Sequence, residues 1–171
     1  MMRKEMMKGF TLLELLVVVA VSGILMGIGG FTVQGFRDRY GVVSQVRQMH
    51  VDMMNARISA LQRNKECFVM VTNNGYQIIE DTNESGGNTP DAGDMALWPE
   101  PKQFKLQSLW AGTLIMKVNG IISLSTRPLL ANTAVAVHFD TAGSDPEYDC
   151  ILVGPTRLSV GKWNGQKCIS K

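Results

Sequence analysis

The sequence predicts an α+β fold in which one long N-terminal helix packs on a mainly antiparallel β-sheet. Three observations support this prediction. The first is an apolar run from Leu15 to Phe31 that contains no charged residue. The second is an amphipathic pattern with helical spacing from Arg37 to Asn64. The third is a series of short apolar runs after the helix, separated by turn residues, which is an α+β order rather than a β–α–β alternation.

The apolar run is long enough to cross a membrane once. At a rise of about 1.5 Å per residue, the stretch from Phe10 to Phe31 spans about 33 Å, close to the hydrocarbon thickness of about 30 Å. One carboxylate, Glu14, lies inside it. A charge at the centre of a membrane costs roughly 2.5–3.5 kcal/mol, so this group calls for a partner. A secretory signal peptide has a shorter apolar region, and a plain signal anchor does not explain Glu14.

We expect the chain to consist of a leader, a membrane segment and one soluble domain. Residues 1–9 carry an excess of positive charge, which keeps the leader on the cytoplasmic side of the membrane. Residues 10–36 are then a single transmembrane helix. Residues 37–171 follow as one soluble domain that faces the periplasm or the outside, because about 135 residues suffice for one hydrophobic core.

The residues around the start of the apolar run form a motif. Lys8 and Gly9 end a short basic leader and are followed by the sequence FTLLEL at positions 10–15. This motif resembles the processing site of type IV prepilins and type II secretion pseudopilins. The resemblance implies cleavage between Gly9 and Phe10 by a prepilin peptidase, then methylation of the new amine. It also implies that Glu14 pairs with the Phe10 amine of a neighbouring pilin subunit, at an inner-membrane assembly platform, and that the domain has a type IV pilin-like fold.

The second half of the long helix, from Arg37 to Asn64, is expected to bury one stripe against the sheet. The stripe repeats at spacings of three and four residues and consists of Val42, Val46, Met49, Met53, Ala56 and Ala60. The opposite side is expected to be a solvated face with Arg39, Arg47, Asp52, Arg57 and Arg63. Glycines at positions 27, 29, 30 and 35 weaken the preceding part of the helix by up to about 1 kcal/mol each. They permit either bending or close packing between helices.

Strands are predicted after the helix. Residues 67–72 and 76–80 form a hairpin through Asn73, Asn74 and Gly75, because Asn-Gly supplies the positive φ of tight turns. Residues 81–103 are acidic and aperiodic, which predicts a long surface loop. Near its end, Met95, Leu97 and Trp98 form either an interaction patch or a packed flap. Further strands are expected at 114–118, 121–125, 134–139, 150–153 and 157–160, with turns at 119–120, 140–143 and 161–165.

Charge and motifs exclude several functions. The leader holds three of the 17 basic and one of the 15 acidic residues, so the rest of the chain has zero net side-chain charge. No global basic field therefore gathers nucleic acid. His50 and His138 lie far apart and no two cysteines are close, so no metal site is expected. The carboxylates at positions 140, 145, 147 and 149 are expected to solvate a turn, and calcium binding is the lesser alternative because the EF-hand spacing is absent. No nucleophile or phosphate-binding motif is present, so we expect neither catalysis nor a cofactor.

Three cysteines, Cys67, Cys150 and Cys168, allow three pairings. An exported domain permits a disulfide. We favour Cys150 with Cys168, since both lie in the C-terminal part and their loop contributes about 3 kcal/mol in the chain-entropy model. Cys67 is then expected to be a buried free thiol.

The later part of the chain resembles the GspH/FimT branch of minor pilins and pseudopilins. The resemblance rests on residues 56–64, at the end of the helix, and on residues 139–143, which look like that branch's Phe-x-x-x-Gly turn. It implies a minor pilin or pseudopilin, a structural subunit of a type IV pilus or a type II secretion pseudopilus. Some members bind DNA through a C-terminal Gly-Arg-x-Arg segment, which this chain lacks. The alternative of a DNA-binding minor pilin in DNA uptake rests on Arg157, Lys162, Trp163 and Lys167, which offer phosphate contacts and base stacking.

Overall fold

The computed structural model describes most of the chain beyond the expected leader. The described residues are 10–83, 87–98, 100–104, 106, 110–129 and 133–171, with only the backbone described at positions 28–34. Gly9, the predicted cleavage residue, lies outside this set. The chain divides into two compact units, residues 1–37 and 38–171. Helix α1 (Leu12–Arg63) contributes to both of them.

In the first unit, α1 begins at Leu12 and runs through the stretch that the sequence predicts to cross a membrane. Over the residues that the structure describes, no helix combines the length and the apolar character that a membrane span requires.

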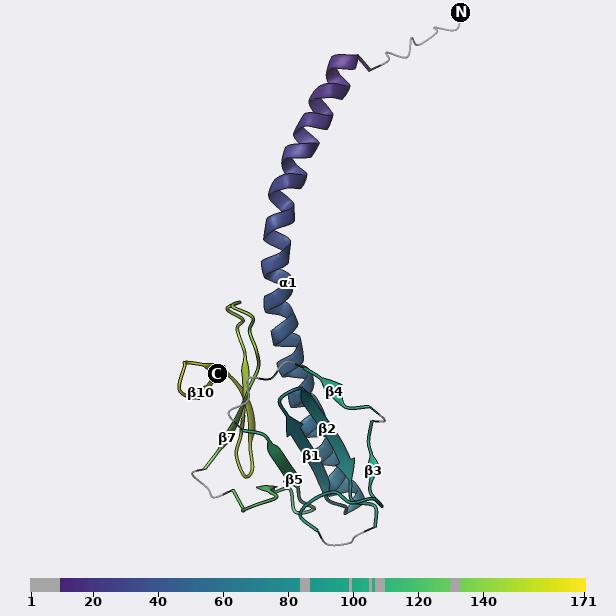
Figure 1. The fold of residues 1–171 in the computed structure, drawn as a ribbon, viewed down its shortest axis with the longest axis vertical. Coiled ribbons are helices and arrows are strands. Elements are labelled where there is room, and N and C mark those ends of the chain that lie inside the picture. The colour runs from purple at the N-terminus through teal and green to yellow at the C-terminus, as the bar shows by residue number, and fades with distance from the viewer. Residues whose placement is uncertain (1–9, 84–86, 99, 105, 107–109, 130–132) are drawn as a thin grey trace, which may run out of the picture. The chain divides into compact units, whose positions relative to one another are not determined.

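The second unit has two antiparallel sheets (Figure 1). In the first sheet the order is β3-β2-β1-β5-β6, and β4 also pairs with β2. In the second sheet the order is β10-β9-β8-β7. The strands are β1 (Cys67–Thr72), β2 (Gly75–Glu80), β3 (Met95–Ala96), β4 (Lys102–Gln103), β5 (Gly112–Met116), β6 (Ile122–Leu124), β7 (Val135–His138), β8 (Cys150–Val153), β9 (Leu158–Trp163) and β10 (Cys168–Ser170). The predicted α+β class and antiparallel pairing are confirmed, with two sheets where the sequence suggested one.

The core lies between the C-terminal part of α1 and both sheets. The predicted stripe from Val42 to Ala60 is buried at all six positions, with at most 7% of any residue exposed. It packs in one cluster with Val69 and Leu114 of the first sheet and Ile151 of the second. The 3.6-residue period of the helix therefore identified the buried face correctly.

The first hairpin is present, but its turn differs from the prediction. Thr72 pairs directly with Gly75, so Asn73 and Asn74 are the two turn residues. Neither of these has a positive φ, whereas Gly75 has a φ of 148° at the start of β2. A Cβ on Gly75 would lie 2.0 Å from the Lys102 carbonyl oxygen. Glycine is therefore required here on two counts, the positive φ that the sequence predicted for this residue and the close approach of β4.

The segment predicted as a loop at 81–103 follows the edge of β2 for part of its length. β3 pairs with β2 at Ile79–Ala96 and β4 pairs with it at Tyr76–Lys102. Leu97 and Trp98 pack against the core, while Met95 is 66% exposed. The packed-flap interpretation therefore holds for Leu97 and Trp98. The sequence missed these strands because each is only two residues long.

At the C-terminus β8 has the predicted bounds, whereas β9 is longer than predicted and β10 was not predicted. β9 continues through Gly161 to Trp163, and the turn lies at 164–167 instead of 161–165. β10 then returns along β9, with Cys168 opposite Trp163. A Cβ on Gly161 would lie 2.3 Å from the Ile169 carbonyl oxygen. Gly161 is thus a strand residue at a close contact, which sequence reasoning mistook for a turn residue.

Candidate functional site

The first turn of α1 is closed by Thr11. Its Oγ1 accepts the backbone N–H of Glu14 at 3.3 Å, and its carbonyl accepts the N–H of Leu15 at 3.2 Å. These contacts make Thr11 the N-cap, which stabilises a helix by about 1 kcal/mol. Glu14 is then the third helical residue, where a carboxylate faces the positive end of the helix dipole. No hydrogen bond or ion pair from the described residues reaches the Glu14 carboxylate.

Apolar side chains surround this start of α1. Phe10 is 84% exposed, and the large apolar residues from Leu12 to Met26 are each between 50% and 83% exposed. Ser22 is polar, but its hydroxyl donates to the Val18 carbonyl at 2.7 Å and so stays within the helix. A helix that is apolar on all sides is stable only when lipid or other helices cover it. Within the described residues of the first unit, no side chain covers this surface.

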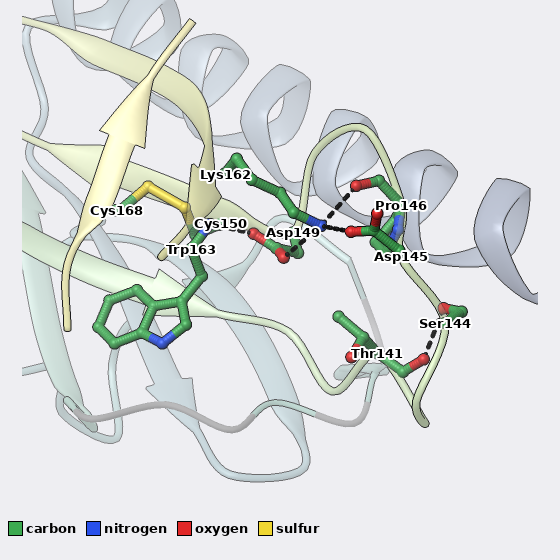
Figure 2. A network of polar contacts seen from close by, with 9 residues as sticks. All are labelled: Thr141, Ser144, Asp145, Pro146, Asp149, Cys150, Lys162, Trp163 and Cys168. Carbon is green, nitrogen blue, oxygen red and sulfur yellow. Dashed lines mark hydrogen bonds and ion pairs between the residues drawn. A yellow bond between two sulfur atoms is a disulfide. The ribbon is translucent and has the colours of Figure 1, made fainter. Parts of the chain in front are cut away.

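Among the residues predicted to contact DNA, Lys162 is held by its own domain. Its Nζ donates to Asp145 Oδ1 at 2.6 Å and to the Pro146 carbonyl at 2.7 Å, and lies 3.2 Å from Asp149 Oδ2 (Figure 2). Burial lowers the pKa of Lys162, but the two carboxylates outweigh this effect and raise it above its ordinary value. The pKa of the Asp145 carboxyl is held low by the same contact. The charge of Lys162 is therefore already balanced.

Trp163 also makes contacts within its own domain. Its indole stacks on the His138 ring, with 4.9 Å between centroids, and its backbone N–H donates to Asp149 Oδ1 at 2.5 Å. Burial lowers the pKa of His138, against the opposing effect of Asp149 and Asp140. Asp149 is 3% exposed. The prediction that Asp149 solvates a turn is therefore wrong, because this carboxylate joins β9 to the loop before β8.

The two remaining cations of the predicted DNA site, Arg157 and Lys167, are exposed but far apart. Arg157 directly precedes β9, and Lys167 lies in the turn that follows it. A strand of this length extends about 20 Å. The structure thus does not gather Arg157, Lys162 and Lys167 into one basic surface. Within the described residues, no group of acidic, histidine or cysteine side chains fits a metal ion.

The structure has a disulfide between Cys150 and Cys168, the pair favoured from the sequence, with Cα atoms 6.0 Å apart. It ties β8 to β10 across β9 (Figure 2). Cys67 is a buried free thiol on β1. Burial, with the nearby Glu80 carboxylate, raises the pKa of this thiol to about 11. Cys67 is therefore a neutral core residue at ordinary pH and not a reactive thiolate.

Sequence reasoning missed one polar network. Asp52 was predicted on the solvated face of α1, yet it is 3% exposed. It accepts hydrogen bonds from the Tyr76 hydroxyl, from Lys102 Nζ at 2.7 Å and from Gln48 Nε2 at 3.0 Å. Burial and the bond to Asp52 raise the pKa of Tyr76. The signal was available, because Asp52 follows Met49 by three residues and so borders the apolar stripe.

The comparisons with known proteins bear on the N-terminus. A family model described as the prokaryotic N-terminal methylation motif matches residues 6–32. Neither the curated proteins nor the solved structures include a match to the chain. The matched segment contains Phe10, the Thr11 cap and Glu14, together with the exposed apolar helix described above. The motif supports a type IV prepilin-like protein, which a prepilin peptidase processes and which assembles with other pilin subunits.

Proposed function

We propose that the chain is a minor pilin or pseudopilin of the GspH/FimT branch, with a type IV pilin-like fold. It is a non-catalytic structural subunit of a type IV pilus or a type II secretion pseudopilus. The observation that carries the proposal is the methylation motif at residues 6–32, on a helix whose apolar side chains are exposed. Antiparallel sheets packed on the later part of the same helix add support, as does the turn after Phe139, where Gly143 has a φ of 78°.

In this proposal a prepilin peptidase cleaves between Gly9 and Phe10, and the new amine of Phe10 is methylated. Residues 10–36 hold the subunit in the inner membrane as a single-pass anchor, with residues 37–171 in the periplasm. The assembly platform then moves the subunit into the fibre. The exposed apolar surface from Leu12 to Met26 exchanges lipid for neighbouring helices in that step.

Glu14 gives this step a driving force. A lone carboxylate in hydrocarbon is penalised, and so is the cationic amine of a processed Phe10. Pairing between Glu14 of one subunit and the Phe10 amine of its neighbour removes both penalties. The described residues leave the Glu14 carboxylate available for such a partner.

A local role for Glu14 is the alternative. Glu14 is the third residue after the Thr11 cap. Its carboxylate therefore lies near the positive end of the helix dipole and stabilises the helix without a partner from another subunit. The Glu14→Gln variant separates the two roles, because it keeps size and hydrogen bonding but removes the charge. The assembly role predicts normal cleavage and membrane insertion, with loss of the subunit from sheared fibres.

Asp38→Asn is the matched control, since Asp38 is an exposed carboxylate on the same helix in the second unit. We expect this variant to enter fibres as the parent does. If Glu14→Gln also enters fibres at the parental level, the pairing of Glu14 with Phe10 is wrong. DNA binding is not part of the proposal, because Lys162 is already neutralised within the domain.

A further inference from the structure

Ser123 lies on the face of the first sheet opposite the core cluster, beside the buried side chains of Phe68 and Ile115, with which it is in register. Ile122 and Leu124 of β6 belong to the core cluster. Ser123 lies between them, so its side chain leaves the sheet on the opposite face. The same alternation places Lys117 and Ser125 on that face, since Lys117 pairs through its N–H with Ile121 and the Ser125 N–H bonds to the Thr113 carbonyl.

These residues line a hollow of about 220 Å³. Ser123, Ser125 and Thr126 contribute hydroxyl groups, Asn88 contributes an amide, and Lys117 and Arg127 contribute positive charge. Among the described lining residues none is acidic. The turn that carries Arg127 is fixed by the bond from the Leu124 N–H to the Arg127 carbonyl at 3.0 Å.

The Ser123 hydroxyl has no hydrogen-bond partner among the residues that the structure describes. The residue is 5% exposed, and its Oγ is the one buried side-chain polar atom without a hydrogen bond in the described part of the chain. An unsatisfied buried hydroxyl destabilises a protein, and an alanine here would avoid that cost. Ser123 is thus placed where a bound group would complete its hydrogen bonding.

The charge in the hollow is also incompletely balanced. Lys117 has one carboxylate partner, Glu66, with 3.3 Å between Nζ and Oε1. The Arg127 guanidinium has no ion-pair partner among the described residues. One net positive charge therefore lies beside three hydroxyls and an amide, all of which can donate hydrogen bonds.

We propose that this hollow binds a phosphate group. Phosphate presents several acceptor oxygens to the guanidinium, the ammonium and the Ser123 hydroxyl, and Arg is well suited to bind it with two parallel bonds. The volume is several times the roughly 30 Å³ that one water occupies, which leaves room for a small substituent. The group is either free phosphate or the phosphodiester of a phospholipid headgroup. The site does not depend on the assembly role.

The test uses the full chain in an uncharged detergent and isothermal titration at constant ionic strength, with chloride as the reference anion. The two probes are inorganic phosphate and glycerophosphoglycerol, the water-soluble headgroup of phosphatidylglycerol. We expect saturable binding of at least one probe. Ser123→Ala and Arg127→Gln should each weaken it by about tenfold or more. The matched controls Ser170→Ala and Arg39→Gln, at exposed positions outside the hollow, should bind as the parent does.

A thermal scan separates binding from folding. Without a probe, Ser123→Ala should melt at or above the parental temperature, because it removes an unsatisfied hydroxyl. With the probe, the parent should gain thermal stability and the variant should not. If glycerophosphoglycerol binds at least as tightly as inorganic phosphate, the natural ligand is a phospholipid headgroup. If only inorganic phosphate binds, the natural ligand is the free ion. If neither probe saturates, or if Ser123→Ala and Arg127→Gln bind like the parent, the site is refuted.

Discussion

Replacing Asp52 by alanine tests whether the buried network on α1 holds the domain together. The Asp52 side chain is 4% exposed and joins α1 to β2 through Tyr76 and to β4 through Lys102. Removing one partner of a buried charge pair costs about 3–5 kcal/mol, because the other group remains unpaired. The Lys102 side chain is 30% exposed, so water can solvate its ammonium group once Asp52 is removed. The cost for this pair is therefore expected at the lower end of that range. The Tyr76 hydroxyl stays buried and adds about 1 kcal/mol or more.

We therefore expect Asp52→Ala to lower the free energy of unfolding by about 3–4 kcal/mol. The assay is urea denaturation of the full chain in detergent, followed by tryptophan fluorescence. Asp38→Ala is the control on the same helix, and its exposed side chain predicts a change within about 0.5 kcal/mol. A loss below about 1 kcal/mol for Asp52→Ala would refute the inference that this network stabilises the packing of β2 and β4 on α1.

Two further predictions concern the core and the second sheet. Because the folded state raises the pKa of Cys67 from 9.0 to about 11, the stability from the neutral thiol is complete below pH 9 and is lost as pH rises to 11. In the Cys67→Ala variant, the free energy of unfolding should fall less steeply between pH 9 and pH 11 than in the parent. The measurement is a set of unfolding curves across that pH range, and the same dependence on pH in both proteins would contradict the prediction. Gly161→Ala should destabilise the domain, because its Cβ would lie 2.3 Å from a β10 carbonyl oxygen, whereas Gly41→Ala, in open space on α1, should stabilise it by up to about 1 kcal/mol. Equal unfolding midpoints for the two glycine variants would contradict the close contact of β9 with β10.

The sequence predicts best where one local rule decides the structure. The apolar stripe from Val42 to Ala60 follows from helical period alone, and all of its positions are buried. For Asp52 the helical period shows only that it borders the stripe, since period cannot show that Tyr76 and Lys102 reach it from β2 and β4. A charge at the border of a stripe is solvated or buried according to partners that lie far away in sequence.

Glycines show the same limit. Gly75 and Gly161 were both assigned to turns, because turns are the commonest reason for glycine in short motifs. The structure places both at strand positions where another backbone approaches closely. That approach depends on β4 and β10, and these strands are too short to be recognised from sequence. The candidate phosphate hollow was missed for a related reason, since Lys117, Ser123 and Arg127 meet only through the pairing of β5 with β6 and the turn that follows.

The mature N-terminus tests the account of this protein most directly. The methylation motif at residues 6–32 and the exposed helix behind it predict a subunit that a prepilin peptidase has processed. Mass spectrometry of the chain extracted from membranes should find a first residue Phe10 with a methylated amine when the cells hold an active peptidase. In cells without the peptidase the same chain should keep residues 1–9. A chain that still begins at Met1 in the presence of the active peptidase would contradict the account.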